Sequence, residues 1–132
     1  LMYWVWSGRY GKMLYIWFMK SEERIQQEII MEFNNTYKTY RGLLCYNLNN
    51  SIGGYRGRVN KFLGLVKGRS DLVFYWNGSA YHIELKTATG QQKPEQKDWQ
   101  ALVERYGFKY YIIRSSEDGM KLIASIIKNH PL

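Results

Sequence analysis

The chain has 132 residues and a mass of 15.8 kDa, a length typical of one domain. Its 45% hydrophobic and 23% charged residues exclude the disordered and fibrous classes, and its single cysteine excludes a disulfide framework and a zinc site built on paired cysteines. Nineteen Lys and Arg against eleven Asp and Glu give a net charge of +8, which favours a polyanionic partner.

The longest apolar run covers residues 13–19, whereas a membrane-spanning helix needs about 20 residues. We therefore expect no membrane association, and nucleic acid becomes the favoured polyanion. The lone cysteine also suits a reducing compartment, so we expect a cytoplasmic location.

Residues 1–18 differ in composition from the rest of the chain, with three tryptophans, three tyrosines and two charged residues. We predict that they form an aromatic-rich extension to a single domain at 19–132. Exposed aromatic side chains need a partner surface, so this extension is either a dimer-forming segment or not native to the working protein.

The first predicted element of the domain is a helix from Ser21 to about Asn35, whose first-turn Glu22 and Glu23 suit the helix dipole. Apolar residues at helical spacing predict its buried face: Ile25, Ile29, Ile30, Met31 and Phe33. Residues 36–69 are predicted as a loop, with the glycines at 53, 54 and 57 marking a mobile part. This region is strongly basic through Arg41, Arg56, Arg58, Lys61, Lys67 and Arg69.

A β-hairpin is predicted next, with strands at 71–76 and 80–86 joined by the turn signal Asn77-Gly78. We expect Trp99, Leu102, Val103 and Tyr106 to share one face of the helix that follows. The remaining predicted elements are a loop at 87–94, that helix at 95–106, a strand at 109–114 and a helix at 116–128. This order predicts an α/β fold, with a mixed central sheet flanked by helices.

The hairpin concentrates charged groups at one end. Antiparallel pairing across the turn places Asp71 opposite about position 84, and the side chains of Glu84 and Lys86 point to the same face because strand periodicity is two. Two carboxylates suit Mg²⁺, and the Leu85 carbonyl can add a further oxygen. Lys86 would orient or deprotonate an attacking water, or neutralise charge on the phosphate. His82 lies on the same face, where it either lines the site or is merely exposed, and exposure is the favoured expectation.

These residues resemble a known nuclease motif. Gly68-Arg69-Ser70-Asp71-Leu72, followed after twelve residues by the run that contains Glu84 and Lys86, is similar to the PD-(D/E)xK motif, with Ser70 in the place of proline. Further residues at matching spacing resemble VRR-NUC domains in particular: Gly90, Gln96, Trp99, Gly107 and residues 111–115. The similarity extends from about residue 21 to about residue 125.

The resemblance implies a restriction-endonuclease-like core and hydrolysis of DNA phosphodiesters that depends on Mg²⁺, with Mn²⁺ as a substitute. It implies that Asp71 and Glu84 hold the metal and that Lys86 serves catalysis. Gln96 would act near the site or touch the DNA backbone. The resemblance also implies a first-helix glutamate that helps to hold the metal. Glu22, on one helical face with Gln26, is the better match to it, and Glu23 is the competing match.

The chain looks like the small stand-alone members of phage type, which resemble Holliday junction resolvases and act as homodimers. The resemblance therefore implies that it resolves four-way junctions in branched DNA as a homodimer, in a bacterial or phage-infected cell. No small-molecule cofactor is implied. We predict six contacts to DNA, at Gln26, Arg56, Arg58, Lys61, Lys67 and Arg69, with a solvated basic loop as the competing interpretation. The alternative functions are a nuclease that nicks flaps or duplexes and a basic DNA-binding module with an inactive site.

Overall fold

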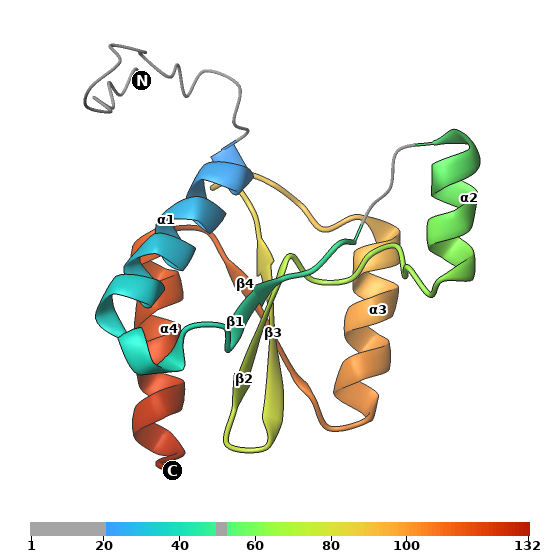
Figure 1. The fold of residues 1–132 in the computed structure, drawn as a ribbon. Helices are drawn as coiled ribbons and strands as arrows, with labels where there is room; N and C mark the ends of the chain where they lie inside the picture. Colours follow the sequence, from blue (N-terminus) through green and yellow to red (C-terminus); the bar gives the residue numbers. More distant parts are fainter. Residues whose placement is uncertain (1–20, 50–52) are drawn as a thin grey trace, which may run out of the picture.

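The structure is a computed structural model that describes residues 21–49 and 53–132. The aromatic-rich extension predicted at 1–18 lies outside the described residues. Figure 1 shows the described elements, which follow in chain order. They are α1 (Ser21–Thr36), a 3-10 helix η2 (Lys38–Tyr40), β1 (Leu44–Tyr46), α2 (Gly54–Phe62), β2 (Leu72–Trp76), β3 (Ser79–Leu85), α3 (Pro94–Arg105), β4 (Lys109–Ile113) and α4 (Ser116–Asn129).

The four described strands form one sheet in the order β1-β2-β3-β4. β1 pairs antiparallel with β2, and β2 pairs antiparallel with β3 across the predicted turn, where Asn77 and Gly78 both have positive φ, 44° and 75°. β4 pairs parallel with β3, because the chain crosses back through α3 before β4 begins. The predicted α/β fold with a mixed sheet flanked by helices is confirmed.

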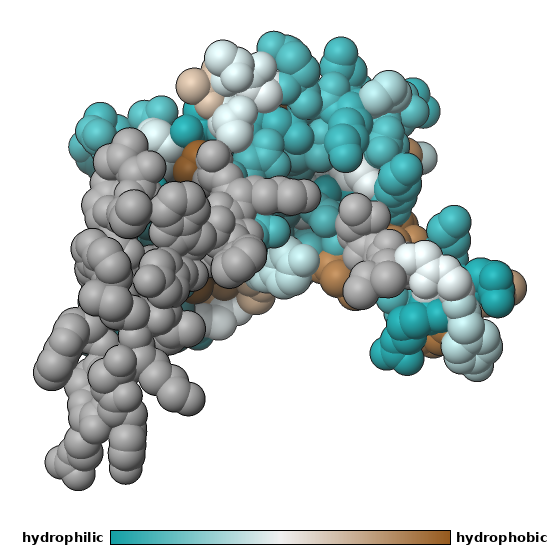
Figure 2. All heavy atoms as spheres, turned by 90° about the horizontal axis from the view of Figure 1, so that it is seen from above, coloured by the Kyte–Doolittle hydropathy of each residue, from teal (hydrophilic) through white to brown (hydrophobic). Residues whose placement is uncertain are grey.

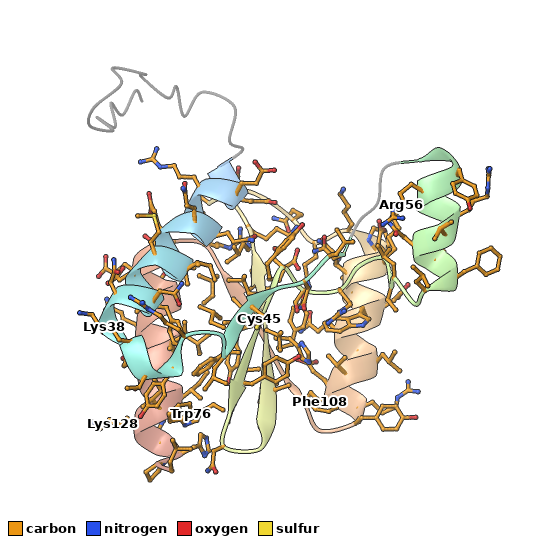
Figure 3. All side chains as sticks on the ribbon, in the orientation of Figure 1. Lys38, Cys45, Arg56, Trp76, Phe108 and Lys128 are labelled. Carbon is orange, nitrogen blue, oxygen red and sulfur yellow. The ribbon has the colours of Figure 1, made fainter. Side chains whose placement is uncertain are left out.

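Helices cover both faces of the sheet. α1 and α4 pack side by side on one face, and α3 covers the other (Figure 1). In Figure 3 Trp76 lies on the side of the sheet that faces α4, where its indole N–H donates to the His130 carbonyl at 2.7 Å. The buried core fills the space between this face and the helices α1 and α4, and its members are Ile29, Phe33, Leu44, Leu72, Phe74, Trp76, Tyr81, Ile83, Leu85, Ile113, Ile123 and Ile126.

Three residues assigned to buried helix faces are exposed: Met31, Leu102 and Tyr106. Met31 follows Ile29 by two residues, which is about 200° around a helix, so it points away from the core that Ile29 enters. On α3, the half-buried pair is Trp99 and Val103, one turn apart, and Leu102 and Tyr106 lie on the neighbouring stripe.

The prediction of a loop over residues 36–69 is wrong at two places. β1 adds a fourth strand, but three residues are too few to show an alternating pattern in the sequence. The glycine-rich segment predicted as mobile begins the helix α2, with Gly57 buried on it. Glycine is a poor helix former, so the composition of this segment gave no indication of a helix.

Gly68 sits at a tight contact between the turn before β2 and the start of α3. Its φ is +89°, and a Cβ added there would lie 2.3 Å from the Glu95 carbonyl oxygen. Gly42 has a similar φ of +93° with no atom within 4 Å of an added Cβ. Gly42→Ala therefore measures the conformational strain alone, about 1–2 kcal/mol.

We expect Gly68→Ala to lower the free energy of unfolding by roughly 1–3 kcal/mol more than Gly42→Ala, because the added methyl group collides with backbone. Urea unfolding followed by circular dichroism measures both variants. Equal losses in the two variants would contradict the close approach of these segments.

Within the described ranges 21–49 and 53–132, no helix has the length and apolar character that a membrane span requires.

Candidate active site

A cleft of about 390 Å³ opens at the end of the sheet where β2 begins and β3 ends. The first turns of α1 and α3 border it, so elements distant in sequence converge there (Figure 1). The residues that line it are Glu22, Glu23, Gln26, Tyr46, Asn49, Lys67, Gly68, Arg69, Asp71, Glu84, Lys86, Gln91, Lys93, Glu95 and Gln96. Most of the predicted site residues therefore meet in one cavity, at the edge where the hairpin strands were expected to place them.

Asp71 is held in a fixed orientation directly before β2. Leu72 pairs with Ile83, so the register places Asp71 opposite Glu84. The Leu85 backbone N–H donates to Asp71 Oδ2 at 2.8 Å, and the Asn49 side chain donates to Asp71 Oδ1 at 3.1 Å. Burial raises the pKa of Asp71 above its usual value, although these two hydrogen bonds act in the opposite direction.

Glu84 is almost completely buried, with 1% of its surface exposed. Its Oε1 atom lies 3.1 Å from the buried Lys86 ammonium and also accepts a hydrogen bond from the Gln96 side chain. Its Oε2 atom is buried and has no hydrogen-bond partner among the residues that the structure describes. Burial, followed by the charge of Asp71, raises the pKa of Glu84 to about 7.

His82 is buried, so the expectation that it is exposed is wrong. It lies on the face of β3 that α3 covers, where its ring meets Trp99 edge-on at 4.8 Å and Phe108 at 5.9 Å. The sequence shows that 82, 84 and 86 alternate with apolar residues, but it does not show that α3 crosses this face. Burial, and then the charge of Arg69, lower the pKa of His82, so it suits a neutral structural position beside the cleft.

The first turn of α1 reaches the cleft with both candidate glutamates. Glu22 is half-buried, and its charge raises the pKa of Asp71 and of Glu84. Glu23 and Gln26 also line the cavity. In the part of the chain that the structure describes, no group of three or more His, Cys, Asp or Glu side chains is arranged to hold a metal ion. The role of Glu22 as a metal ligand therefore stays a prediction. Asp71, directly before β2, lies opposite Glu84 on the paired strand β3.

Gln96 connects the cleft to the start of α3. Its Oε1 atom accepts a hydrogen bond from the Lys93 backbone N–H at 2.8 Å, as in a capping box, and its amide N–H donates to Glu84. The position three residues into α3 therefore points the amide at the acidic pair. Leu85 contributes its N–H to Asp71 and its side chain to the core, and the ligand role of its carbonyl stays a prediction.

The loop after Lys86 is fixed by Arg114, which follows β4. Its guanidinium donates to the carbonyls of Thr87 at 2.6 Å and of Gly90 at 2.9 Å. Gly90 has no room for a side chain, because a Cβ there would lie 2.9 Å from Thr87 Oγ1. This loop therefore keeps one shape beside Glu22 and Lys86.

The predicted basic residues divide into two groups. Lys67 and Arg69 line the cleft, where Lys67 pairs with Glu95 at 3.2 Å and Arg69 donates to the Asn47 side chain at 3.0 Å. The other three, Arg56, Arg58 and Lys61, lie on α2, outside the lining of the cleft.

Among the polar residues that sequence reasoning missed, Asn49 and Tyr110 act most directly on the acidic pair. Asn49 follows β1 and orients Asp71, but β1 itself was not predicted. Tyr110 is buried in β4 beside β3, and burial and the charge of Glu84 raise its pKa. Its hydroxyl accepts a hydrogen bond from Gln92 at 3.3 Å. Tyr110 could not be assigned to the site from the sequence, because only the parallel pairing of β4 with β3 brings it close to Glu84.

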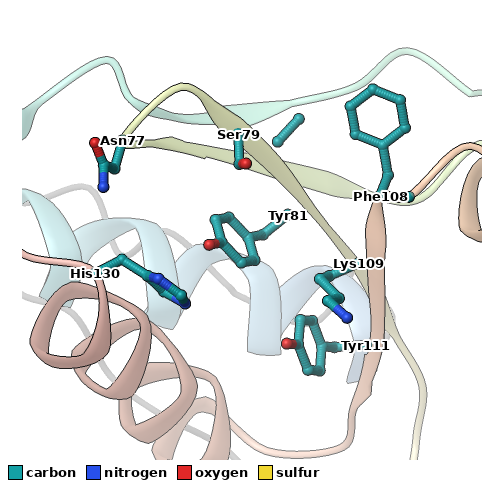
Figure 4. Close-up of a pocket in the computed structure, with 9 residues that line it drawn as sticks. Asn77, Ser79, Tyr81, Phe108, Lys109, Tyr111 and His130 are labelled. Atoms are coloured by element: carbon teal, nitrogen blue, oxygen red, sulfur yellow. The ribbon is translucent and has the colours of Figure 1, made fainter.

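A second cavity of about 260 Å³ lies at the opposite end of the hairpin (Figure 4). Figure 4 shows Tyr81, Tyr111 and Lys109 around it, with His130 from the end of α4. The nine residues that line it include no carboxylate. The cleft around Asp71 and Glu84 is therefore the better candidate for hydrolytic chemistry.

The fold and cleft together define a mixed α/β domain with an acidic pair at one end of its sheet. The sequence matches no family model, and no curated protein matches it. One solved structure, described as a VRR_NUC domain protein, superposes with a TM-score of 0.64 at 18% identity, over 83% of this chain and 90% of the other. Another, described as a VRR_NUC domain, gives 0.54 at 19% identity, over 80% and 97%. The chain has the fold of these VRR-NUC domains, which confirms the predicted resemblance at the level of the fold.

Proposed function

We propose that the protein is a metal-dependent nuclease that hydrolyses phosphodiester bonds in DNA. The observation that carries this proposal is the convergence of Asp71, Glu84 and Lys86 in one cleft, with a buried Glu84 oxygen that lacks a partner. Buried charged groups are costly unless they are paired, so such a cluster is expected where function requires it.

The residues present fit a divalent cation. The carboxylates of Asp71, directly before β2, and of Glu84, on the paired strand β3, lie opposite each other and supply hard oxygen donors. Glu84 Oε2 accepts no hydrogen bond from the described residues, so it is available to bind a cation. Glu84 is buried and Asp71 is half-buried, and the charge of Asp71 disfavours ionisation of Glu84, so a cation between them would remove the conflict. A divalent cation held there would supply positive charge against the phosphate and lower the pKa of a water molecule.

The role that we propose for Lys86 is to act on the reacting phosphate. Its ammonium has three N–H donors, and it forms an ion pair with Glu84 Oε1 at 3.1 Å. A remaining donor would neutralise charge that develops on a phosphate oxygen, or orient the attacking water. In the reaction, the water oxygen bonds to phosphorus, the bond to the 3′ oxygen breaks, and the leaving oxygen takes up a proton.

For the finer specificity, we propose branched DNA as the substrate, including four-way junctions cut by a homodimer. A twofold pair of subunits would present two clefts to two strands related by the same symmetry. The support for this assignment is the VRR-NUC resemblance and the basic residues beside the cleft, Lys67 and Arg69. A nuclease that nicks flaps or duplexes has the same cleft chemistry and differs in the DNA that it accepts.

A cleavage assay tests the proposed function. End-labelled four-way junction, flap and linear duplex DNA are each incubated with the protein in Mg²⁺, in Mn²⁺ and in EDTA. We expect cleavage in Mg²⁺ and Mn²⁺, none in EDTA, and the highest rate on the junction. Binding without cleavage of any of the three DNAs in either metal would contradict the proposal and favour a DNA-binding module with an inactive site.

A further inference from the structure

The helix α2 is the feature of the described fold that the proposed chemistry leaves unexplained. Figure 1 shows it standing apart from the sheet and from α1 and α4. Figure 2, which looks down on the cleft end, shows it as a separate group of side chains in which hydrophilic and hydrophobic residues are mixed. Tyr55 is 76% exposed and Phe62 is 92% exposed, so two large aromatic side chains face solvent on a helix of nine residues.

These aromatic side chains share one face with a cation. Tyr55, Arg58 and Phe62 are spaced by three and four residues, which places them in one stripe along the helix. Gly57, the buried residue of this helix, lies outside the stripe. Lys61 borders this stripe, whereas Arg56 lies on the other side of the helix, and in Figure 3 it projects from the side of α2 nearer to α3.

The charge on this part of the chain selects the kind of partner. Residues 33–70 contain seven Lys and Arg and no Asp or Glu. Two copies of α2 meeting through their outward faces would bring like charges together, which is unfavourable. A polyanion with flat groups matches both properties, because phosphates pair with Arg and Lys and exposed bases stack on aromatic rings.

The position of α2 connects it to the cleft. The chain that leaves α2 runs through Gly64 to Lys67 and Arg69, which line the cavity. Gly68 lies against the start of α3, and Lys67 pairs with Glu95 at 3.2 Å, so this connection is anchored.

We propose that the outward face of α2 binds unpaired nucleotides, with bases stacked on Tyr55 and Phe62 and phosphates held by Arg58 and Lys61. This inference rests on the proposed function and adds to it a binding surface on α2 for the unpaired bases of the DNA. Splayed ends and branch points expose such bases, whereas a blunt duplex does not.

Fluorescence anisotropy in EDTA tests the proposal without cleavage. The probes are a labelled 20-nucleotide oligo(dT) and a blunt duplex of the same length. We expect Tyr55→Ala/Phe62→Ala to weaken oligo(dT) binding by about tenfold or more, since stacking is lost, and to change duplex binding by less than about twofold. The matched control is Tyr106→Ala, whose ring is 73% exposed at the far end of α3, and it should bind both probes as the wild type does.

A second variant, Tyr55→Leu/Phe62→Leu, keeps apolar bulk but removes the rings, and it should bind oligo(dT) as weakly as the alanine variant. Oligo(dT) affinity equal to the wild type in either variant would overturn the proposal. So would a change from dimer to monomer in light scattering, because α2 would then bind a second copy. Wild-type protein that binds oligo(dT) through α2 but cuts no DNA in Mg²⁺ would refute the proposed function and leave this inference standing.

Discussion

Lys86→Ala is expected to reduce the rate of DNA cleavage by about a thousandfold while DNA affinity changes little. The ammonium is buried beside Glu84, 3.1 Å from its Oε1 atom, and away from the exposed basic residues of α2. Groups that act on the transition state contribute factors of about 10²–10⁴ to rate without holding the substrate. Single-turnover cleavage of a labelled junction in Mg²⁺, with anisotropy in EDTA, separates the two quantities.

The matched control is Lys97→Ala, which removes an exposed lysine from α3 and should leave the cleavage rate unchanged. Lys86→Met keeps the bulk of the side chain and removes only the ammonium group, so it separates a catalytic defect from a packing defect. It should be as inactive as the alanine variant. Cleavage by either Lys86 variant at more than about a tenth of the wild-type rate would contradict the catalytic role.

Glu84→Gln is expected to abolish cleavage and to stabilise the metal-free protein at high pH. The pKa of Glu84 is about 7, above its usual value of 4.5, so the folded state binds the proton more tightly than the unfolded state. Stability of the wild type should therefore fall as pH rises from about 4.5 to about 7. The loss is at most about 3 kcal/mol, because a tenfold difference in proton affinity corresponds to about 1.4 kcal/mol. Glutamine carries no charge and removes most of this slope.

Urea unfolding in EDTA at pH 5 and pH 8 measures the effect, and Glu32→Gln, an exposed glutamate on α1, is the matched control. The control should keep the wild-type dependence on pH. A Glu84→Gln protein whose stability falls with pH as steeply as that of the wild type would show that Glu84 ionises normally in the folded state.

The acidic pair could be predicted because local rules determine it. Asn77-Gly78 has the positive φ values of a tight hairpin turn, and this turn sets the register that places Asp71 opposite Glu84. Strand periodicity then places Glu84 on the side opposite the core residue Ile83. Each step depends on residues close together in the sequence, so no knowledge of the tertiary fold was needed.

The surroundings of the pair depend on tertiary contacts and could not be predicted in the same way. His82 is buried because α3 crosses over it, and Asn49 reaches Asp71 because β1 joins the sheet beside β2. Tyr110 approaches Glu84 because β4 pairs with β3 after the crossover. The helical form of α2 also escaped prediction, since its glycines are typical of turns.

Titration of the protein with Mn²⁺, followed by calorimetry, tests the central claim most directly, because the claim is that Asp71 and Glu84 share one divalent cation. Wild-type protein should bind Mn²⁺ at the cleft, Asp71→Asn should weaken this binding by about tenfold or more, and Asp98→Asn, which changes an exposed acid on α3, should leave it unchanged. Wild-type protein that binds no Mn²⁺, or an Asp71→Asn variant that binds it as tightly as the wild type, would contradict the account.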